Sequence, residues 1–595
     1  MRAIRSTILV ALVLVPLAPL AATPADDHDI FLSTLPWKGL EPSQDLGGAA
    51  HGAGEALAAL AGVETLPVAC GTPLARSLAI HGTSAPLEAM RLAVAHRPAL
   101  DPERVVLTPD GTIAVRFPGA PGSTGLLSAD RDRNGTPDLV DRVLEALAAS
   151  RSFLVTRLGY PTPVPDGGRL DVYLAELGHG LEGYTVPEGQ GSPPFVVLDA
   201  GLLSDRVMPA TIHQMAHLSL LSLSARAPLW WDEAGAAFLS LTASGDLQAH
   251  EAAIRVRAQA RGRGLATDGL LSMEGTLLWP LFLSESTGDP GTVRAIWEEM
   301  ATQGIDPLAA TDQVLRHRGR SLAQAHREFS AWNLFTGERD DGQHYASGRS
   351  LPAAPLATMG PETPFRVDPA ESIEPLGAAA YRVPGDGRRG SLDLEITVEG
   401  GRPAADLLIF YHGGPAQPVL AGVTFDPSGI GRISLPSADV RETWVILRND
   451  ALPGTGGEAR FAVRGSSDPY APYDLASFTA SASATSILLD WTTASEKDLA
   501  AWNVYRAETP AGPFTRLNTV AVPAAGDSAG DTGYIFLDDF ARGGRRYYYQ
   551  IEGITRSGLP QRSHVVSGRI PAAPASPSPV PASRSGRPAP AGSSR

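Results

Sequence analysis

The spacing of apolar positions divides this chain into a region of mixed strands and helices and a later region of strands alone. Within 101–345, short apolar runs predict strands at 105–107, 113–117, 169–175 and 195–199. Pro109-Asp110-Gly111 separates the first two runs and predicts a hairpin. A helical period predicts helices at 139–158, 205–224, 230–241, 246–260, 270–285, 291–303 and 308–333. Strands followed mainly by helices favour an α+β domain over 101–345.

Local signals refine this region at two places. Asp205 is a candidate N-cap for the helix at 205–224, and Pro209 falls in its early turn, where a missing N–H matters little. The Gly-rich stretch 178–192 predicts a loop between two strands. His179 and Tyr184 lie in that stretch and either border a cleft or belong to an ordinary loop, which is the preferred interpretation.

From about residue 360 the pattern changes to short apolar runs separated by Gly/Pro turns, which is typical of β-sandwiches. In 360–466 the predicted strands are 379–383, 391–398, 405–411, 430–434, 443–448 and 459–464. In 470–571 they are 487–491, 502–506, 514–517, 534–537 and 546–554. The predicted fold class is therefore multidomain, with an α+β domain followed by two all-β sandwich domains.

The two ends of the chain differ from the rest. A basic start, an apolar run at 8–20 and small residues at 21–25 predict a secretory signal peptide at 1–25. The run is short for a membrane span, so a retained anchor is the weaker alternative, and no span is expected after signal cleavage. Residues 26–100 are a leader and an N-terminal helical region, whose role as a propeptide stays open. The Pro/Ser-rich residues 572–595 predict a disordered tail.

Composition narrows the possible functions. The formal net charge of the 595 residues is −15, and basic residues do not cluster, so a nucleic-acid partner is not expected. Cys70 is the only cysteine, which excludes an intramolecular disulfide. An exported chain with one thiol favours a buried Cys70 over a reactive one.

The segment His213-Gln214-Met215-Ala216-His217 carries the strongest chemical signal. Histidines four residues apart lie on one face of a helix, where both imidazoles reach a single Zn²⁺. Glu233 follows on the next predicted helix and is the expected third ligand. The competing interpretation, two core histidines satisfied by hydrogen bonds, is weakened because two lone histidines in an apolar helix are costly to desolvate.

The residue after the first histidine decides whether such a site can work. A zinc peptidase with H-E-x-x-H uses that Glu as general base, and here the position is Gln214, whose amide cannot accept a proton. Asp232 or Glu233 are substitutes, but Glu233 is better placed as a ligand and Asp232 is expected to project elsewhere on its helix. An impaired or inactive site is favoured over an active one.

A second metal-type motif begins at Asp130. Counted from Asp130, oxygen-bearing side chains occupy the EF-hand loop positions, Gly135 stands at the turn position, and Asp141 replaces the usual bidentate Glu. The alternative is a polar turn that caps the following helix. The possible calcium ligands are Asp130, Asp132, Asn134, Thr136, Asp138 and Asp141.

The order of these motifs resembles a family of uncharacterised secreted bacterial metalloproteases of the gluzincin type. The similar segments are 132–138, 170–173, 213–217, 230–233 and 331–339. The resemblance implies a zincin-like domain at 101–345, with His213, His217 and Glu233 as zinc ligands and extracellular proteolysis as the activity; Gln214 departs from the family pattern. The unit at 470–571 is similar to fibronectin type III modules, with Trp491 as the buried aromatic.

Two functions remain in competition. The first is a secreted zinc metallopeptidase or its inactive relative, acting on an extracellular protein or peptide with Zn²⁺ and in addition Ca²⁺. The second is an extracellular binding or surface protein, in which the β-sandwich modules recognise a ligand and the zincin-like domain is a scaffold. Gln214 favours the second and the retained ligands favour the first. An intracellular enzyme of another class is disfavoured by the leader.

Overall fold

The structure of the protein is a computed structural model. It describes residues 70–81, 95, 97–119, 127–164, 168–178, 180–187, 193–266, 270–359, 365–366, 371–385, 391–412, 417–436, 440–468, 472–483, 485–510 and 512–571. The predicted signal peptide at 1–25, most of the leader at 26–100, His179 and the tail at 572–595 lie outside these residues.

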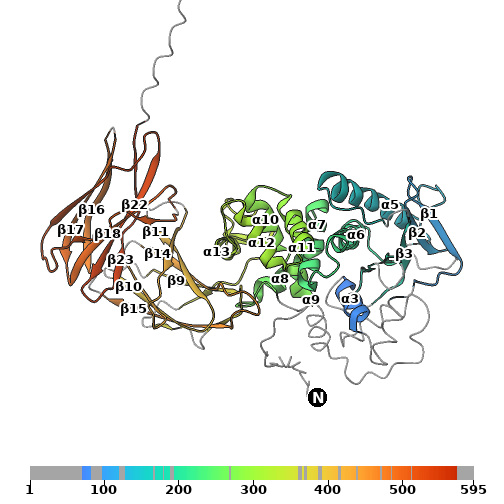
Figure 1. Ribbon diagram of the computed structural model, residues 1–595, viewed down its shortest axis with the longest axis horizontal. Helices are drawn as coiled ribbons and strands as arrows, with labels where there is room; N and C mark the ends of the chain where they lie inside the picture. Colours follow the sequence, from blue (N-terminus) through green and yellow to red (C-terminus); the bar gives the residue numbers. More distant parts are fainter. Residues whose placement is uncertain are drawn as a thin grey trace, which may run out of the picture.

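A five-stranded mixed sheet forms one end of the molecule (Figure 1). Its order is β1 (Glu103–Leu107), β2 (Ile113–Pro118), β3 (Leu170–Ala175), β5 (Phe195–Asp199) and β4 (Gly183–Val186). The predicted hairpin is confirmed by the antiparallel register of β1 and β2, while β2, β3 and β5 run parallel. The loop predicted at 178–192 is wrong in part, because β4 pairs antiparallel with β5 and forms the edge of the sheet. Only four residues long, β4 is too short to show a pattern.

Helices pack beside this sheet and continue toward the middle of the molecule (Figure 1). They are α3 (Thr72–His81), α5 (Asp138–Ser150) with its π-helical extension η1 (Arg151–Arg157), α6 (Val207–Leu223), α7 (Leu229–Ser244), η2 (Gln248–His250), α8 (Glu251–Gln259), α9 (Leu270–Gly275), α10 (Leu278–Thr287), α11 (Thr292–Gln303), α12 (Pro307–Arg316), α13 (Leu322–Trp332), η3 (Gly337–Arg339) and η4 (Gly348–Ser350). None of the helices in the described part of the chain combines the length and the hydropathy needed to cross a membrane.

Three helix predictions need correction. The helix predicted at 270–285 is divided into α9 and α10 by a turn at Thr276 and Leu277, and Pro280, which lacks an N–H, stands in the first turn of α10. The helix predicted at 308–333 is divided into α12 and α13, because Gly319 adopts a φ of +72° and Ser321 starts α13 with a capping box to Gln324. Asp205 does not cap α6: the N-cap is Arg206, and its side chain makes no capping bond. The start of α6 is held instead by burial, since Val207 and Pro209 pack in the core.

Helices α6 and α7 lie at the centre of the first core. Apart from their last turns, almost every residue of either helix is buried, which is expected of helices packed on all sides. Gly235 allows their close approach, because a Cβ there would lie 3.0 Å from Leu220 Cδ1. The two most shielded helices therefore carry the candidate ligands.

A β-sandwich follows the helices. One sheet has the order β12 (Val419–Val423), β11 (Pro403–Tyr411), β14 (Val440–Asn449), β9 (Ala378–Pro384), β6 (Ala357–Thr358). The facing strands are β13 (Ile430–Pro436), β10 (Ser391–Glu399), β15 (Ala459–Asp468), β7 (Phe365–Arg366) and β8 (Glu371–Ile373). Side chains such as Leu407, Val445 and Phe461 fill the space between them. All six strands predicted here are present, and β12 and the shortest strands were not predicted.

The last unit is a second β-sandwich joined to the first. A sheet of β16 (Tyr473–Ala482), β17 (Ile487–Glu496) and β21 (Thr532–Asp538) faces strands of a second sheet across a core that contains Trp491 and Trp502. The facing strands are β18 (Leu499–Ala507), β19 (Thr515–Arg516), β20 (Val522–Pro523), β22 (Arg546–Thr555), β23 (Pro560–Arg562) and β24 (Val566–Arg569). Strand β23 also pairs in parallel with β13 of the first sandwich, so one sheet of 11 strands runs through both.

Buried charges fix the helices to the first sandwich. From α13, His326 Nδ1 lies 2.8 Å from Asp450 Oδ1, and Arg327 donates to Asp406 of β11. Arg448 of β14 donates to both acids, at 2.9 Å to Asp406 Oδ2 and 2.6 Å to Asp450 Oδ1. Since Asp406 and Arg448 are almost fully buried, these ion pairs hold the two units in one orientation.

Candidate metal centre

The three predicted ligand residues lie together between α6 and α7. His213 and His217 project from adjacent turns of α6, and Glu233 projects from the first turns of α7. His213 Nε2 lies 3.1 Å from His217 Nε2 and 3.2 Å from Glu233 Oε1, and His217 Nε2 lies 3.4 Å from Glu233 Oε2. All three side chains are buried. The three groups therefore converge on one point away from solvent.

Cys70, which precedes α3 in the region predicted as a leader, joins this group. Its Sγ lies 3.4 Å from His217 Nε2, and the ligand atoms of Cys70, His213, His217 and Glu233 all lie within 4.8 Å of one another. The sequence predicted a buried Cys70, which is confirmed, but gave no sign of this contact across 147 residues.

The spacing of the donor atoms fits a tetrahedral zinc ion. Bonds of about 2.0–2.3 Å to nitrogen, oxygen and sulfur place the ligand atoms of a tetrahedron about 3.3–3.6 Å apart. The observed separations of 3.1–3.4 Å are close to that range. Glu233 Oε2 is buried and accepts no hydrogen bond from the described residues, as expected of an atom whose partner is a cation.

Asp232 orients one of the histidines, which corrects the expectation that it projects elsewhere. Its Oδ1 lies 3.0 Å from His217 Nδ1, and its Oδ2 accepts a bond of 2.7 Å from Arg76. A carboxylate that accepts a hydrogen bond from Nδ1–H keeps the proton on Nδ1 and leaves the Nε2 lone pair directed at the metal position. Adjacent residues differ by only about 100° around a helix, so Asp232 and Glu233 both face α6.

Gln214 is fully engaged by its neighbours. Its Oε1 accepts hydrogen bonds from Thr72 Oγ1 at 3.0 Å and from Thr185 Oγ1 at 2.8 Å. These two hydroxyls fix the amide so that Nε2 donates toward Cys70 Sγ at 3.4 Å. The side chain at the position of a general base is therefore a hydrogen-bond donor to sulfur.

The charges of the site compensate one another. Burial alone would lower the pKa of His213, but Cys70 and Glu233 raise that pKa to about 10. Burial and Glu233 would raise the pKa of the Cys70 thiol, yet His213 and His217 hold it below its ordinary value. Burial would also raise the pKa of Glu233, and the same histidines lower it. A divalent cation would take the place of the protons that balance these anions.

The space beside the site is small. A cavity of about 20 Å³ touches Cys70, His213 and Gln214 and is bounded on its far side by Arg206 and His250. This volume is enough for about one water molecule and too little for a peptide. His250 is held by Glu274, with Nδ1 and Oε1 2.9 Å apart. Tyr184 is buried in β4 and does not border an open cleft.

Three of the six predicted calcium ligands converge in the loop before α5. The carboxylates of Asp130, Asp132 and Asp138 offer oxygens within 4.8 Å of one another. Gly135 makes the turn with a φ of +90°. Asn134 Nδ2 donates to Asp132 at 3.1 Å and to Asp141 at 3.0 Å.

The remaining positions of this loop are less favourable for a cation. Thr136 contacts the group through its backbone N–H, which donates to Asn134 Oδ1 at 2.7 Å. The alternative, a polar turn that caps α5, is borne out only in its turn: Asp130 accepts from the N–H groups of Asn134 and Gly135, whereas α5 has Pro137 at its N-cap and no side-chain capping bond. Asp130, Asp132 and Asp138 thus form a carboxylate cluster. The other three predicted ligands, Asn134, Thr136 and Asp141, are connected to it only by hydrogen bonds.

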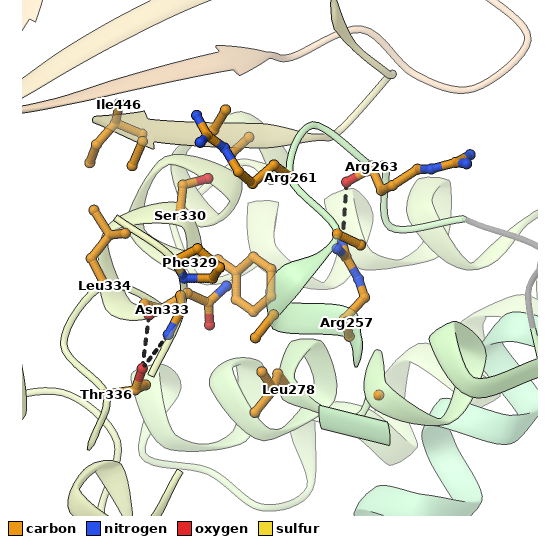
Figure 2. Close-up of a pocket in the computed structure, with 18 of the residues that line it drawn as sticks. Arg257, Arg261, Arg263, Leu278, Phe329, Ser330, Asn333, Leu334, Thr336 and Ile446 are labelled. Atoms are coloured by element: carbon orange, nitrogen blue, oxygen red, sulfur yellow. Dashed lines mark hydrogen bonds between the residues drawn. The ribbon is translucent and has the colours of Figure 1, made fainter. Parts of the chain in front are cut away.

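A second cavity lies where α8, α10 and α13 meet the first sandwich. Figure 2 shows Arg257, Arg261 and Arg263 along this cavity, opposite Phe329 and Leu334. The arginines are used within the protein: Arg261 pairs with Glu371, Arg263 pairs with Glu374, and Arg257 donates to the Arg263 carbonyl. The cavity is therefore part of the contact between two units.

Comparisons with known proteins give no family. No protein-family model matches the chain, and no curated protein matches it. Among solved structures, an Fn3-like protein from Clostridium thermocellum is 17% identical over 16% of this chain and 90% of its own, with a TM-score of 0.13. A pectate lyase from Erwinia chrysanthemi is 22% identical over 15% of this chain and 27% of its own, with a TM-score of 0.13.

A β-1,2-glucanase from Parabacteroides distasonis is 10% identical over 35% of this chain and 32% of its own, also with a TM-score of 0.13. Except for the Fn3-like protein, the chain spans about a third or less of these relatives. Similarity at this level carries no argument about function, and the fold assignment rests on the strand pairing described above. What is established is a multidomain chain in which an α-helical region with a mixed sheet precedes β-sandwich units.

Proposed function

We propose that this chain is an exported zinc protein with a peptidase-type site that does not hydrolyse peptide bonds. The supporting observation is the convergence of two imidazoles and a carboxylate from adjacent buried helices, with an amide at the position of the general base. Nitrogen and oxygen donors with these spacings suit Zn²⁺. The proposal includes the gluzincin-type assignment of 101–345 and the fibronectin type III assignment of 470–571.

Each residue of the site has a defined task in this proposal. His213, His217 and Glu233 would hold the metal, and Asp232 keeps His217 in the tautomer that can bind it. A zinc ion in such a site would supply polarisation of a carbonyl and activation of water. Gln214 cannot take the proton of that water, because an amide is not basic and its oxygen already accepts two hydroxyl hydrogens.

Calcium enters as a second, structural ion. The carboxylates of Asp130, Asp132 and Asp138 would bind it, and it would fix the turn that leads into α5. Helix α5 packs against α6, which carries the histidines, so order in this loop supports the zinc site from a distance.

Zinc analysis of the purified full-length protein tests the proposal. We expect about one Zn²⁺ per chain, lost in His213→Ala and in Glu233→Ala and kept in His412→Ala, a change at an exposed histidine. The wild-type protein should not cleave casein with or without added zinc. A protein without zinc, or wild-type cleavage that a chelator abolishes, would contradict the proposal.

A second candidate function is ligand recognition by the β-sandwiches, and a groove between them favours it. The groove has a volume of about 710 Å³ and is lined by Phe425 and Arg432 of the first unit and Tyr505, Glu552 and Arg562 of the second. Aromatic rings beside paired charges are suited to a polar ligand with flat apolar faces. Binding of soluble oligosaccharides and peptides to the full chain should fall in Tyr505→Ala and persist in Phe540→Ala, which lies outside the groove.

A further inference from the structure

Cys70 and Gly71 lie at the edge of the sheet beside the candidate metal centre, and the helix α3 begins directly after them at Thr72. Cys70 forms a parallel bridge with Gly183 of β4, and the Gly71 N–H donates to the Gly183 carbonyl at 2.9 Å. Thr185 N donates to Thr72 Oγ1 at 3.0 Å. Extended peptides add to a sheet edge through such main-chain bonds. Cys70 and Gly71 therefore occupy the edge position to which an extended peptide would bind near the centre, and the first turns of α3 lie next to it.

Close packing leaves no room for a second chain there. Every residue from 70 to 76 is buried. A Cβ at Gly183 would lie 2.7 Å from the Val197 carbonyl oxygen and 3.3 Å from Gln214 Cγ, so β4 passes directly over the site. At the far end of the stretch, Arg76 forms a buried ion pair with Asp232 and also donates to the Ala227 carbonyl at 2.8 Å.

The sulfur of Cys70 has the surroundings of a bound thiolate. It lies with three other donors around one point, and two N–H groups point at it: Thr72 N and Gln214 Nε2, each at 3.4 Å. Donors of this kind stabilise a negatively charged sulfur. Glu233 Oε2 is buried, makes no hydrogen bond within the described residues and lies 3.4 Å from the ligand nitrogen of His217, which marks the same point as a cation position independently of the cysteine.

We propose that Cys70 is the fourth protein ligand of the metal centre and that Gln214 is present to support this thiolate. The inference rests on the proposed function. On metal binding the Cys70 S–H bond breaks, its proton leaves to solvent, and the sulfur lone pair forms the bond to Zn²⁺. Four protein ligands describe a closed, structural zinc site, whereas hydrolytic sites keep one position for water.

The Gln214 substitution follows from this arrangement. A glutamate at position 214 would place carboxylate oxygens about as far from Cys70 Sγ as the present amide nitrogen, which lies at 3.4 Å. Two anions at that distance repel each other, and the donation to sulfur would be lost. An amide at position 214 and a cysteine ligand at position 70 therefore fit each other, and the buried segment 70–76 closes the site.

Absorption of the Co²⁺-loaded full-length protein tests the inference. A thiolate bound to Co²⁺ gives a charge-transfer band in the near ultraviolet that imidazole and carboxylate ligands lack, and Cys70 is the only cysteine in the chain. We expect the band in wild type and its loss in Cys70→Ser, with Co²⁺ still bound but at least about 10-fold more weakly, since even partners that only orient a ligand contribute about 10–100-fold. Gln214→Glu should weaken the band, and Gln259→Glu, at an exposed position, should not.

The possible failures can be told apart. Co²⁺ bound by wild type without the band would overturn the role of Cys70 and leave the proposed function standing. No bound Co²⁺ or Zn²⁺ would overturn both. If Cys70→Ser does not fold, alkylation of the wild-type thiol decides: protection by Zn²⁺ and rapid reaction after chelation support the inference, and equal rates contradict it.

Discussion

At the scale of single residues, the contacts of Gln214 explain more than its identity does. Read as a missing general base, it indicates a damaged peptidase. In the structure its oxygen is held by Thr72 and Thr185 and its nitrogen faces Cys70. Because both the oxygen and the nitrogen of this amide make hydrogen bonds, Gln214 is an integral part of the site. The difference matters for the substitution Gln214→Glu. It would restore cleavage in a peptidase that has only lost its base, but it would not do so in a closed structural site.

A double substitution distinguishes these two cases. If Gln214 is only a lost base, Gln214→Glu should give chelator-sensitive cleavage of casein, at roughly 10²–10⁴ over wild type, the usual contribution of a general base. If the site is closed, neither Gln214→Glu nor Cys70→Ser combined with Gln214→Glu should cleave casein, because the buried segment 70–76 still leaves no room for a peptide. Casein assays with zinc analysis of each variant make the comparison. Cleavage by the double variant alone would show that Cys70, and not the segment around it, blocks the site.

Asp232 provides a second prediction at this scale. Asp232→Asn removes the anion that fixes His217 and leaves Arg76 without its ion-pair partner. We expect zinc affinity to fall by about 10–100-fold, as measured by competition with a chelating dye. Glu298→Gln, which breaks an exposed ion pair on α11, is the matched control and should bind zinc like wild type. An unchanged affinity in Asp232→Asn would remove its orienting role.

At the scale of elements, the parts of the site that share a local pattern were predictable and the distant parts were not. His213, His217 and Glu233 follow from helical spacing and from the order of two helices. Cys70 did not, since its contact with His217 spans 147 residues and a single cysteine has no sequence pattern. Asp232 was misjudged because one helix was considered without its neighbour. Strand β4 was missed because four residues show no periodicity.

The two β-sandwiches show the same division. Strands with alternating buried positions, such as β10 and β17, were found from sequence, and strands of two or three residues such as β20 and β23 were not. Short strands are defined by their hydrogen-bond partners, which only the folded chain provides. The pairing of β23 with β13 belongs to this class, and it is the contact that connects the two units.

Calcium binding by the loop before α5 can be tested through its effect on thermal stability. If Asp130, Asp132 and Asp138 bind Ca²⁺, the ion stabilises the folded state by about 2.7 kcal/mol at 100 times its Kd. Thermal unfolding with and without Ca²⁺ should show a rise in Tm for wild type and for Asp474→Asn, an exposed control. Asp132→Asn should not respond. An equal rise in all three proteins would assign the effect to another site.

At the scale of the whole molecule, the charges between α13 and the first sandwich predict a pH dependence. Burial lowers the pKa of His326 below its ordinary value of 6.5, and Asp450 offsets this only in part. Below pH 6.5 the unfolded chain therefore binds a proton that the folded protein does not bind. Stability falls as pH drops through that range, by at most about 1.4 kcal/mol per pH unit.

Thermal unfolding of His326→Gln between pH 7 and 5 checks this. The variant should lose less stability on acidification than wild type, although it starts from a lower Tm because its contact with Asp450 is weakened. His412→Gln, at an exposed position, should follow wild type. Parallel curves for all three proteins would show that His326 does not titrate on unfolding.

The strand β23 has a consequence for how the protein can be divided. Strand β23 lies in the last unit but pairs with β13 of the first sandwich. A shortened protein that ends near residue 470 would therefore lack β23 and leave that edge of β13 unpaired. A bare strand edge recruits other chains, so the shortened protein would tend to self-associate. The two sandwiches therefore share one continuous sheet and are better expressed together than as two separate fragments.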